Sequence, residues 1–265
     1  MRQGHTESPF DTRGFARDVY LIGGVRTVVY SVGEGPAVMY WHGRGTWHGF
    51  AWARDLQHQY RVLLPYHPGF GESEDDPTMR SVGDYVRHYV DLIDHLQIPR
   101  LSLIGASMGG YMAANFAIAH PERIERFVLV SPAGAESPDY PVRSFRDVPF
   151  DELPRMFVVN REVLAPFWPD RWNERIMRET DSGRRILGGT QAPQNAWMSR
   201  LATLHRPALI LWGRGDQILP VNLSRLWAAA IPGSVVRVIE NAGHLLLDES
   251  PEARRVLRAF LSLRS

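Results

Sequence analysis

The stretch Leu101–Tyr111 constrains the fold of this chain more than any other. An apolar run, Leu101–Ile104, passes directly into Gly-Ala-Ser-Met-Gly-Gly. Apolar runs of this kind are typical of strands buried on both faces. The two glycines allow a tight turn and close packing of the strand against a following helix. The stretch therefore predicts a buried strand, a sharp turn at Ser107 and a helix over Met108–Ala119.

The same succession of strand and helix recurs along the chain. Apolar runs predict further strands at 37–41, 61–65, 127–130, 208–212 and 235–239, and three-to-four-residue periodicity predicts helices at 50–58, 81–98, 221–230 and 251–263. A Gly-Gly turn between two β-branched runs, 18–22 and 26–32, predicts a hairpin at the start. Strands that alternate with helices indicate an α/β fold with a mostly parallel sheet and helices on both faces.

One segment, 133–204, departs from this alternation. Proline and aromatic residues become dense there, and helical periodicity is visible at 172–187 and 194–204. We interpret it as a helical cap, or lid, inserted between two strands. The predicted organisation is a core formed by 18–132 and 205–265, a cap at 133–204 and a polar tail at 1–17.

Composition excludes several classes of function. The 265 residues carry a net charge of +1 and contain no cysteine and no lysine. Thiolate catalysis, disulfides, Schiff-base chemistry and a P-loop lysine are therefore excluded. The near-neutral charge does not favour nucleic acid or an anionic membrane as partner. The chain also has no apolar run that resembles a signal peptide or a membrane span, so we expect a cytoplasmic protein.

The turn at Ser107 has the form G-x-S-x-G, which is typical of a nucleophilic serine but also occurs as a plain turn. A nucleophilic serine needs a base that a carboxylate orients. Loops after parallel strands meet at one edge of the sheet. Asp216 and His244 both follow predicted strands there. A turn aspartate and a surface histidine are the alternatives, but the joint placement and the order Ser, Asp, His favour a catalytic triad.

Acyl transfer also requires hydrogen-bond donors for an oxyanion. The backbone N–H of Met108, after the serine, is one candidate. The second is the N–H of Arg44, in the glycine-rich loop after strand 37–41; the alternative for this loop is a plain glycine turn. We expect the Arg44 side chain to turn to solvent, with contact to an anionic substrate as the alternative.

These motifs resemble the α/β-hydrolase superfamily over nearly the whole chain. The matching motifs are H-G-R-G at 42–45, H-P-G-F-G-E-S at 67–73, G-A-S-M-G-G at 105–110, G-R-G-D-Q-I-L-P at 213–220 and N-A-G-H at 241–244. The resemblance implies an eight-stranded sheet, a cap between strands six and seven, and no cofactor or metal. It also implies that Ser107 is the nucleophile, His244 the base and acid, and Asp216 the orienting acid, with the Arg44 and Met108 amides as oxyanion hole.

Ser-Met-Gly-Gly with a helical cap resembles the branch of carboxylesterases, lactonases and meta-cleavage-product hydrolases, which cleave C–C bonds. Two residues depart from the C–C hydrolase pattern: Ala106 stands where asparagine is common, and Leu245 stands where tryptophan is common. Tyr66-His67 also departs, because relatives often place an aspartate there. We consider that His67 approaches the pocket.

We therefore expect a serine hydrolase that cleaves a carboxylester or lactone of a small to medium apolar substrate. The alternatives are a C–C hydrolase acting on vinylogous diketones, a perhydrolase, and a slow-turnover receptor that retains the triad. Candidate substrate contacts are Trp168, Trp172, Trp197 and Leu245, with packing inside the cap as the alternative for the tryptophans. Arg184 and Arg185 are either exposed or recognise a substrate carboxylate. A monomer or homodimer is expected.

Overall fold

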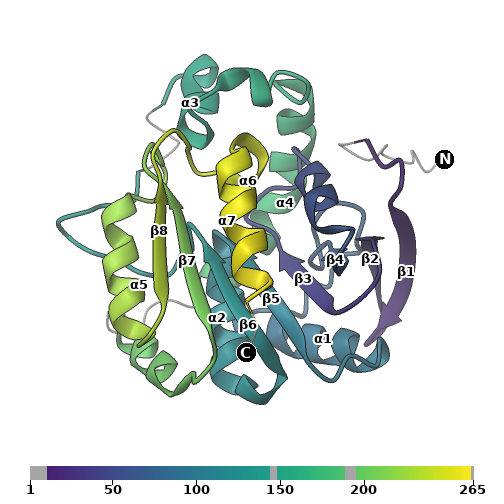
Figure 1. Ribbon diagram of the computed structural model, residues 1–265. Helices are drawn as coiled ribbons and strands as arrows, with labels where there is room; N and C mark the ends of the chain where they lie inside the picture. Colours follow the sequence, from purple (N-terminus) through teal and green to yellow (C-terminus); the bar gives the residue numbers. More distant parts are fainter. Residues whose placement is uncertain (1–10, 144–147, 189–194, 264–265) are drawn as a thin grey trace.

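The computed structural model describes residues 11–143, 148–188 and 195–263, so residues 1–10 of the expected tail lie outside it. Its centre is an eight-stranded sheet with the order β1-β2-β4-β3-β5-β6-β7-β8 (Figure 1). The strands are β1 (Ala16–Ile22), β2 (Val25–Val32), β3 (Ala37–Trp41), β4 (Arg61–Pro65), β5 (Leu101–Ala106), β6 (Ile124–Val130), β7 (Ala208–Gly213) and β8 (Val235–Ile239).

The direction of the strands confirms the predicted sheet. β1 and β2 form an antiparallel hairpin, and β2 pairs antiparallel with β4. All remaining neighbours are parallel. The carboxyl ends of the parallel strands therefore share one edge, which is where the candidate site residues were expected.

The sheet has a hydrophobic core on each face. Along β3, Met39 and Trp41 belong to one core, and Val38 and Tyr40 belong to the other, as the two-residue period of a strand requires. The first face is covered by α1 (Val82–His95), α2 (Met108–Ala119) and α5 (Ser224–Ala230), and the second by η1 (Ala51–Leu56), α6 (Leu246–Glu249) and α7 (Pro251–Leu261). In Figure 1, α7 lies in front of the strands and α2 behind them.

Three predicted helices differ in detail from those observed. The helix expected at 50–58 is the short 3-10 helix η1, and the one expected at 221–230 begins as a 3-10 turn, η7 (Val221–Leu223). Short helices are commonly 3-10 because few α-type hydrogen bonds are available to them. Helix α1 begins with a capping box between Ser81 and Asp84 and ends at His95, before the predicted limit. A further 3-10 turn, η2 (Pro121–Arg123), precedes β6.

The described residues between β6 and β7 contain helices joined by irregular segments, with no strand among them. They form η4 (Phe150–Glu152), α3 (Leu153–Phe157), η5 (Arg161–Val163), α4 (Asp170–Leu187) and η6 (Ala196–Thr203). In Figure 1, α3 lies above one end of the sheet, whereas η6 packs against α2 and α5. The helix expected at 194–204 is the 3-10 helix η6, and residue 194 lies outside the described ranges. We call this segment the cap; its boundaries as a separate domain stay a prediction.

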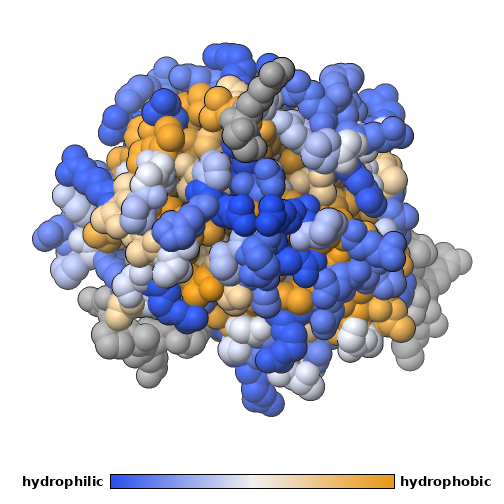
Figure 2. All heavy atoms as spheres, turned by 60° about the horizontal axis from the view of Figure 1, so that its bottom comes forward, coloured by the Kyte–Doolittle hydropathy of each residue, from blue (hydrophilic) through white to orange (hydrophobic). Residues whose placement is uncertain are grey.

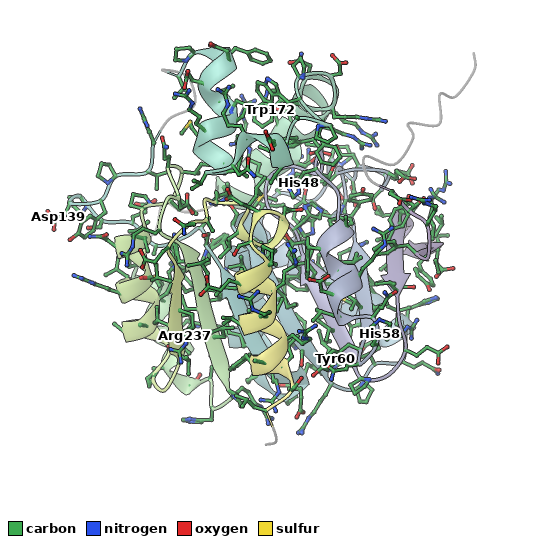
Figure 3. All side chains as sticks on the ribbon, turned by 45° about the horizontal axis from the view of Figure 1, so that its top comes forward. His48, His58, Tyr60, Asp139, Trp172 and Arg237 are labelled. Carbon is green, nitrogen blue, oxygen red and sulfur yellow. The ribbon has the colours of Figure 1, made fainter. Side chains whose placement is uncertain are left out.

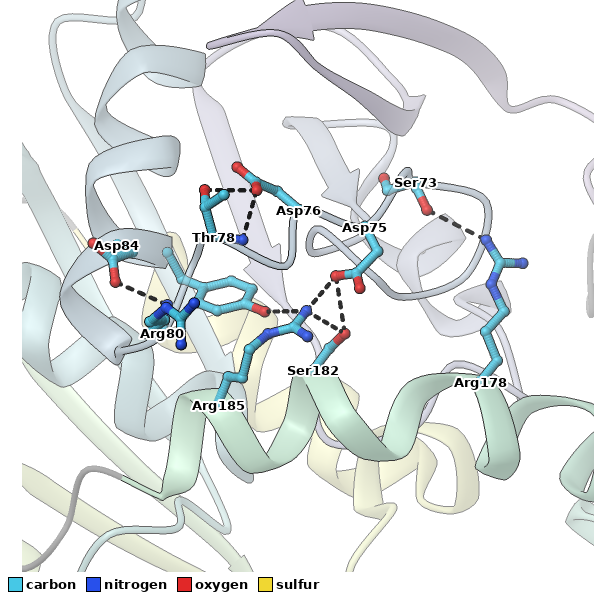
Figure 4. A network of polar contacts seen from close by, with 10 residues as sticks. Ser73, Asp75, Asp76, Thr78, Arg80, Asp84, Arg178, Ser182 and Arg185 are labelled. Atoms are coloured by element: carbon cyan, nitrogen blue, oxygen red, sulfur yellow. Dashed lines mark hydrogen bonds and ion pairs between the residues drawn. The ribbon is translucent and has the colours of Figure 1, made fainter.

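Polar contacts tie helix α4 of the cap to the loop between β4 and α1 (Figure 4). Arg185 pairs with Asp75 and donates to Tyr85 Oη at 3.4 Å. Arg178 donates to the carbonyl of Ser73 at 3.3 Å. This loop follows strand β4, so the contacts hold the cap over the carboxyl edge of the sheet.

The surface at the bottom of Figure 1 is largely hydrophilic, with apolar residues interspersed (Figure 2). Two of the exposed apolar residues, Val19 and Leu21, lie on the edge strand β1. Within ranges 11–143, 148–188 and 195–263, no helix is both long and apolar enough to cross a membrane.

Candidate active site

Ser107 occupies a strained turn between β5 and α2. Its φ is 51°, a left-handed value that a serine seldom adopts. The neighbouring glycines make the turn possible. A Cβ at Gly105 would lie 2.6 Å from Ala113 Cβ, and one at Gly109 would lie 2.1 Å from the Trp41 carbonyl oxygen. The Ser107 N–H donates to the Val130 carbonyl at 3.0 Å, which fixes the serine at the end of its strand.

His244 and Asp216 form a buried hydrogen-bonded pair. His244 Nδ1 lies 2.8 Å from Asp216 Oδ2, and their side chains are 6% and 0% exposed. The other carboxylate oxygen accepts the N–H groups of Ile218 and Leu219, both at 2.9 Å. Because an ionised carboxylate only accepts hydrogen bonds, Nδ1 is the donor. The neutral imidazole then keeps Nε2 as its proton acceptor.

Ser107 and His244 both line a cavity of about 660 Å³ between the core and the cap. Its wall comes from the loops after β3, β5, β6, β7 and β8 and from α3 and α4 of the cap. Most of the wall is apolar, including Val142, Phe157, Trp172, Leu187, Leu219 and Leu245. In Figure 3, Trp172 on the cap and His48 on the core lie close to this boundary. The arrangement encloses the serine beneath apolar side chains.

The four candidate substrate contacts divide into two groups. Trp172 and Leu245 line the cavity. Trp168 and Trp197 are not among the lining residues of the described chain. Trp168 packs against Phe150, with ring centroids 4.7 Å apart, and against Trp172. Trp197 packs against Tyr111 and Trp227 at 5.2 and 5.8 Å. Trp168 therefore packs inside the cap, as the alternative states, whereas Trp197 packs against helices α2 and α5 of the core.

The expected oxyanion donors adjoin the serine. Arg44 and Met108 both line the cavity, and a Cβ at Gly43 would lie 3.1 Å from Ser107 Cβ. The loop that carries Arg44 therefore passes directly over the serine. Met108 is the first residue of α2, where a helical N–H has no partner within the helix. The role of the two amides as oxyanion donors stays a prediction.

The two arginines on the last turn of α4 have different environments. Arg184 lines the cavity, whereas Arg185 is held by Asp75. The Arg44 side chain is exposed and also lines the cavity. Arg44 is therefore exposed to solvent, as the first alternative states, and it also borders the site.

His67 is not among the residues that line the cavity. It forms hydrogen bonds to His42, in the loop after β3, and this loop does line the cavity. The His67 N–H donates to His42 Nε2 at 3.1 Å, so His42 Nδ1 carries the proton and donates to the Gly43 carbonyl at 2.7 Å. His67 Nε2 donates in turn to the His42 carbonyl at 2.9 Å, and Tyr89 Oη donates to Nδ1. Burial lowers the pKa of His67 to about 3 and that of His42 well below its usual value. Both imidazole rings are therefore neutral, and their hydrogen bonds support the loop after β3.

Sequence reasoning missed two groups that shape the site. One is a pair on the cavity wall, His48 Nδ1 and Asp248 Oδ1, 3.3 Å apart; no motif marks either residue. The other is Glu179, a buried carboxylate on α4 that accepts the N–H groups of Thr46 at 3.1 Å and Gly71 at 2.9 Å. An isolated glutamate on a helix with many charges carries no signal of this contact.

Comparison with known proteins identifies the family. A family model described as "Alpha/beta hydrolase family" matches residues 38–255. A 2-hydroxymuconate semialdehyde hydrolase from Pseudomonas sp. strain CF600 is 31% identical over 261 residues, covering 89% of this chain and 90% of the relative.

Two solved structures share the fold. A 2-hydroxy-6-oxo-6-phenylhexa-2,4-dienoate hydrolase from Rhodococcus sp. strain RHA1 superposes with a TM-score of 0.81 at 22% identity, over 94% of this chain and 99% of that one. Naproxen esterase from Bacillus subtilis superposes with a TM-score of 0.77 at 22% identity, over 93% and 91%. The chain belongs to the alpha/beta hydrolase family, and it is a hydrolase.

Proposed function

We propose that this hydrolase cleaves a carboxylester or lactone through an acyl-enzyme at Ser107, without a cofactor. The observation that carries the proposal is the meeting of Ser107 and the His244–Asp216 pair at one cavity. The turn and the backbone hydrogen bond to Val130 hold Ser107 in position, and the hydrogen bond to Asp216 keeps the His244 imidazole in one tautomer.

The chemistry follows from these positions. His244 Nε2 takes the proton of the Ser107 hydroxyl as Oγ attacks the carbonyl carbon. The N–H groups of Arg44 and Met108 stabilise the oxyanion. The imidazolium, stabilised by Asp216, then gives its proton to the leaving alcohol. A water molecule, deprotonated by the same Nε2, then attacks the acyl-enzyme. As the bond from the acyl carbon to Ser107 Oγ breaks, Nε2 returns the proton to Oγ, which releases the acid and regenerates the serine hydroxyl.

A C–C bond hydrolase is the second candidate. The relative that is 31% identical is a 2-hydroxymuconate semialdehyde hydrolase, which favours this alternative. Ala106 and Leu245 favour the ester, since they depart from the C–C hydrolase pattern, and Leu245 lines the cavity. Naproxen esterase shares the fold. We place the ester first because Ala106 and Leu245 adjoin the nucleophile and the base and both line the cavity.

A substrate panel on one preparation tests the proposal. It contains 4-nitrophenyl butyrate, δ-valerolactone and a dienol diketo acid. We expect kcat/KM to be highest for the ester or the lactone, with kcat in the ordinary range of about 1–1,000 s⁻¹. A higher kcat/KM for the dienol acid would instead favour the C–C hydrolase. Turnover far below this range on all three would favour a receptor.

A further inference from the structure

Two arginine side chains from different elements line the cavity. Arg44 comes from the loop after β3, and Arg184 comes from α4 of the cap. The Arg44 side chain extends across α4, because a Cβ at Gly183 would lie 2.8 Å from its Nε and 3.0 Å from its Cγ. Burial, and then the charge of Arg184, lowers the pKa of Arg44. The two cations thus share one part of the wall.

Gly183 is the residue that gives Arg44 this room. It lies inside α4, where glycine is unfavourable relative to alanine. Any larger residue would meet the Arg44 stem. Glycine at position 183 therefore lowers the helix propensity of α4 but leaves space for the Arg44 side chain beside the cavity.

Little negative charge on the protein offsets these cations. Within the described ranges, Arg44 has no hydrogen bond or ion pair. Arg184 pairs with Asp181 at 2.9 Å, but the two side chains are 66% and 78% exposed, and such surface pairs are weak. The acid that lines the cavity, Asp248, faces His48 instead.

A third arginine adds to the positive charge of the wall. Arg143 lines the cavity, and its Nη1 donates to the neutral Gln217 at 3.2 Å. The remaining wall is mainly apolar, with Trp172, Phe157 and Leu187 on the cap side. A ligand that fits both parts has an apolar body and an anionic end.

We propose that Arg44 and Arg184 bind a free carboxylate of the substrate, so that the hydrolase acts on esters of amphiphilic acids. This inference rests on the proposed ester hydrolysis. The planar fork of a guanidinium matches the two oxygens of a carboxylate. The carboxylate would replace the counter-charge that Arg44 lacks in the described chain, while the apolar body lies along Trp172.

Two esters of similar length test the proposal: mono-4-nitrophenyl glutarate, which carries a carboxylate, and 4-nitrophenyl valerate, which does not. The readout is the ratio of their kcat/KM values, glutarate over valerate. We expect a ratio above about 10 for the native protein, because charge-assisted hydrogen bonds to a carboxylate are strong. The ratio should fall as salt is added, because both arginines are partly open to solvent.

Arg184→Gln and Arg155→Gln are a matched pair of variants. Both arginines lie on the cap, and each pairs with an acid three residues earlier at 2.9 Å. Only Arg184 lines the cavity. We expect the ratio to fall about fivefold in Arg184→Gln, a value typical of one partly exposed charge contact, and to stay within about twofold in Arg155→Gln. Gly183→Ala should also lower the ratio, since it displaces Arg44 without a change of net charge.

The outcomes separate the two levels of the proposal. Efficient hydrolysis of the valerate with a ratio near one, or an equal ratio in Arg184→Gln and Arg155→Gln, overturns the carboxylate site and leaves the ester hydrolase intact. Failure of the native protein to hydrolyse either ester overturns the proposed function, and this inference with it.

Discussion

Removal of the Glu179 side chain tests how the cap controls the site. This buried carboxylate accepts the Thr46 N–H at 3.1 Å, the Thr46 hydroxyl at 2.5 Å and the Gly71 N–H at 2.9 Å. Burial raises its pKa, while these hydrogen bonds and the charge of Arg175 oppose that shift. Glu179 thus joins α4 to the loops that follow β3 and β4.

The contacts give the magnitude of the effect. In Glu179→Ala, the N–H groups of Thr46 and Gly71 lose their acceptor, and each unpaired buried N–H costs about 1–3 kcal/mol. The Thr46 hydroxyl rotates to another partner at little cost. Arg175, which is buried without a hydrogen bond among the described residues, loses a nearby negative charge. We expect the free energy of unfolding to fall by about 3–5 kcal/mol, the range for breaking a buried charged contact.

The activity should fall as well, because Thr46 is two residues from Arg44, whose amide is the proposed oxyanion donor. A displacement of this loop by about 1 Å is expected to lower kcat/KM by up to about 100-fold. Urea denaturation followed by tryptophan fluorescence measures stability, and 4-nitrophenyl ester hydrolysis measures activity. Glu152→Ala is the control, since this acid of the cap forms an exposed pair with Arg155 and should cost about 0.5 kcal/mol or less. Equal losses in the two variants would refute the reasoning.

Three further changes have defined outcomes. Asp216→Asn should lower kcat on a nitrophenyl ester by about 10³–10⁴-fold, because an amide does not hold His244 in the required tautomer; a loss below tenfold would contradict that role. The low pKa of His67, about 3 against 6.5, means that only the unfolded chain is protonated between these values. Its contribution to stability is complete above pH 6.5 and decreases below it, by about 2 kcal/mol from pH 7 to pH 5. Urea titrations of the native protein at pH 7 and pH 5 should show this decrease; a constant stability would count against it. Arg185→Ala should cost about 1 kcal/mol or less in the same titration, since Asp75 is 44% exposed; a loss of several kcal/mol would show that the Arg185–Asp75 pair is stronger than its exposure implies.

The sheet was predictable from the sequence because each strand is marked by a short apolar run. The apolar runs at 37–41, 101–104 and 208–212 are buried on both faces, so nearly every residue in them is hydrophobic. The positions of Ser107, Asp216 and His244 followed from the rule that loops after parallel strands converge. These features depend on short segments and on one topological rule.

Features that depend on contacts between distant segments were not predictable in the same way. The sequence does not distinguish Trp168, Trp172 and Trp197 as cavity residues, and only tertiary packing decides that Trp172 alone of the three lines the cavity. Arg184 and Arg185 are adjacent, yet the 100° turn between successive helical residues sends one to the cavity and the other to Asp75. His67 was considered for the pocket and instead braces His42.

Labelling with a fluorophosphonate tests the central claim, that Ser107 is the nucleophile activated by His244. The account predicts one adduct per chain, located by mass spectrometry on Ser107, with loss of ester hydrolysis in proportion to labelling. It also predicts no adduct in Ser107→Ala. An adduct on another residue, or full ester hydrolysis in Ser107→Ala, would contradict the account.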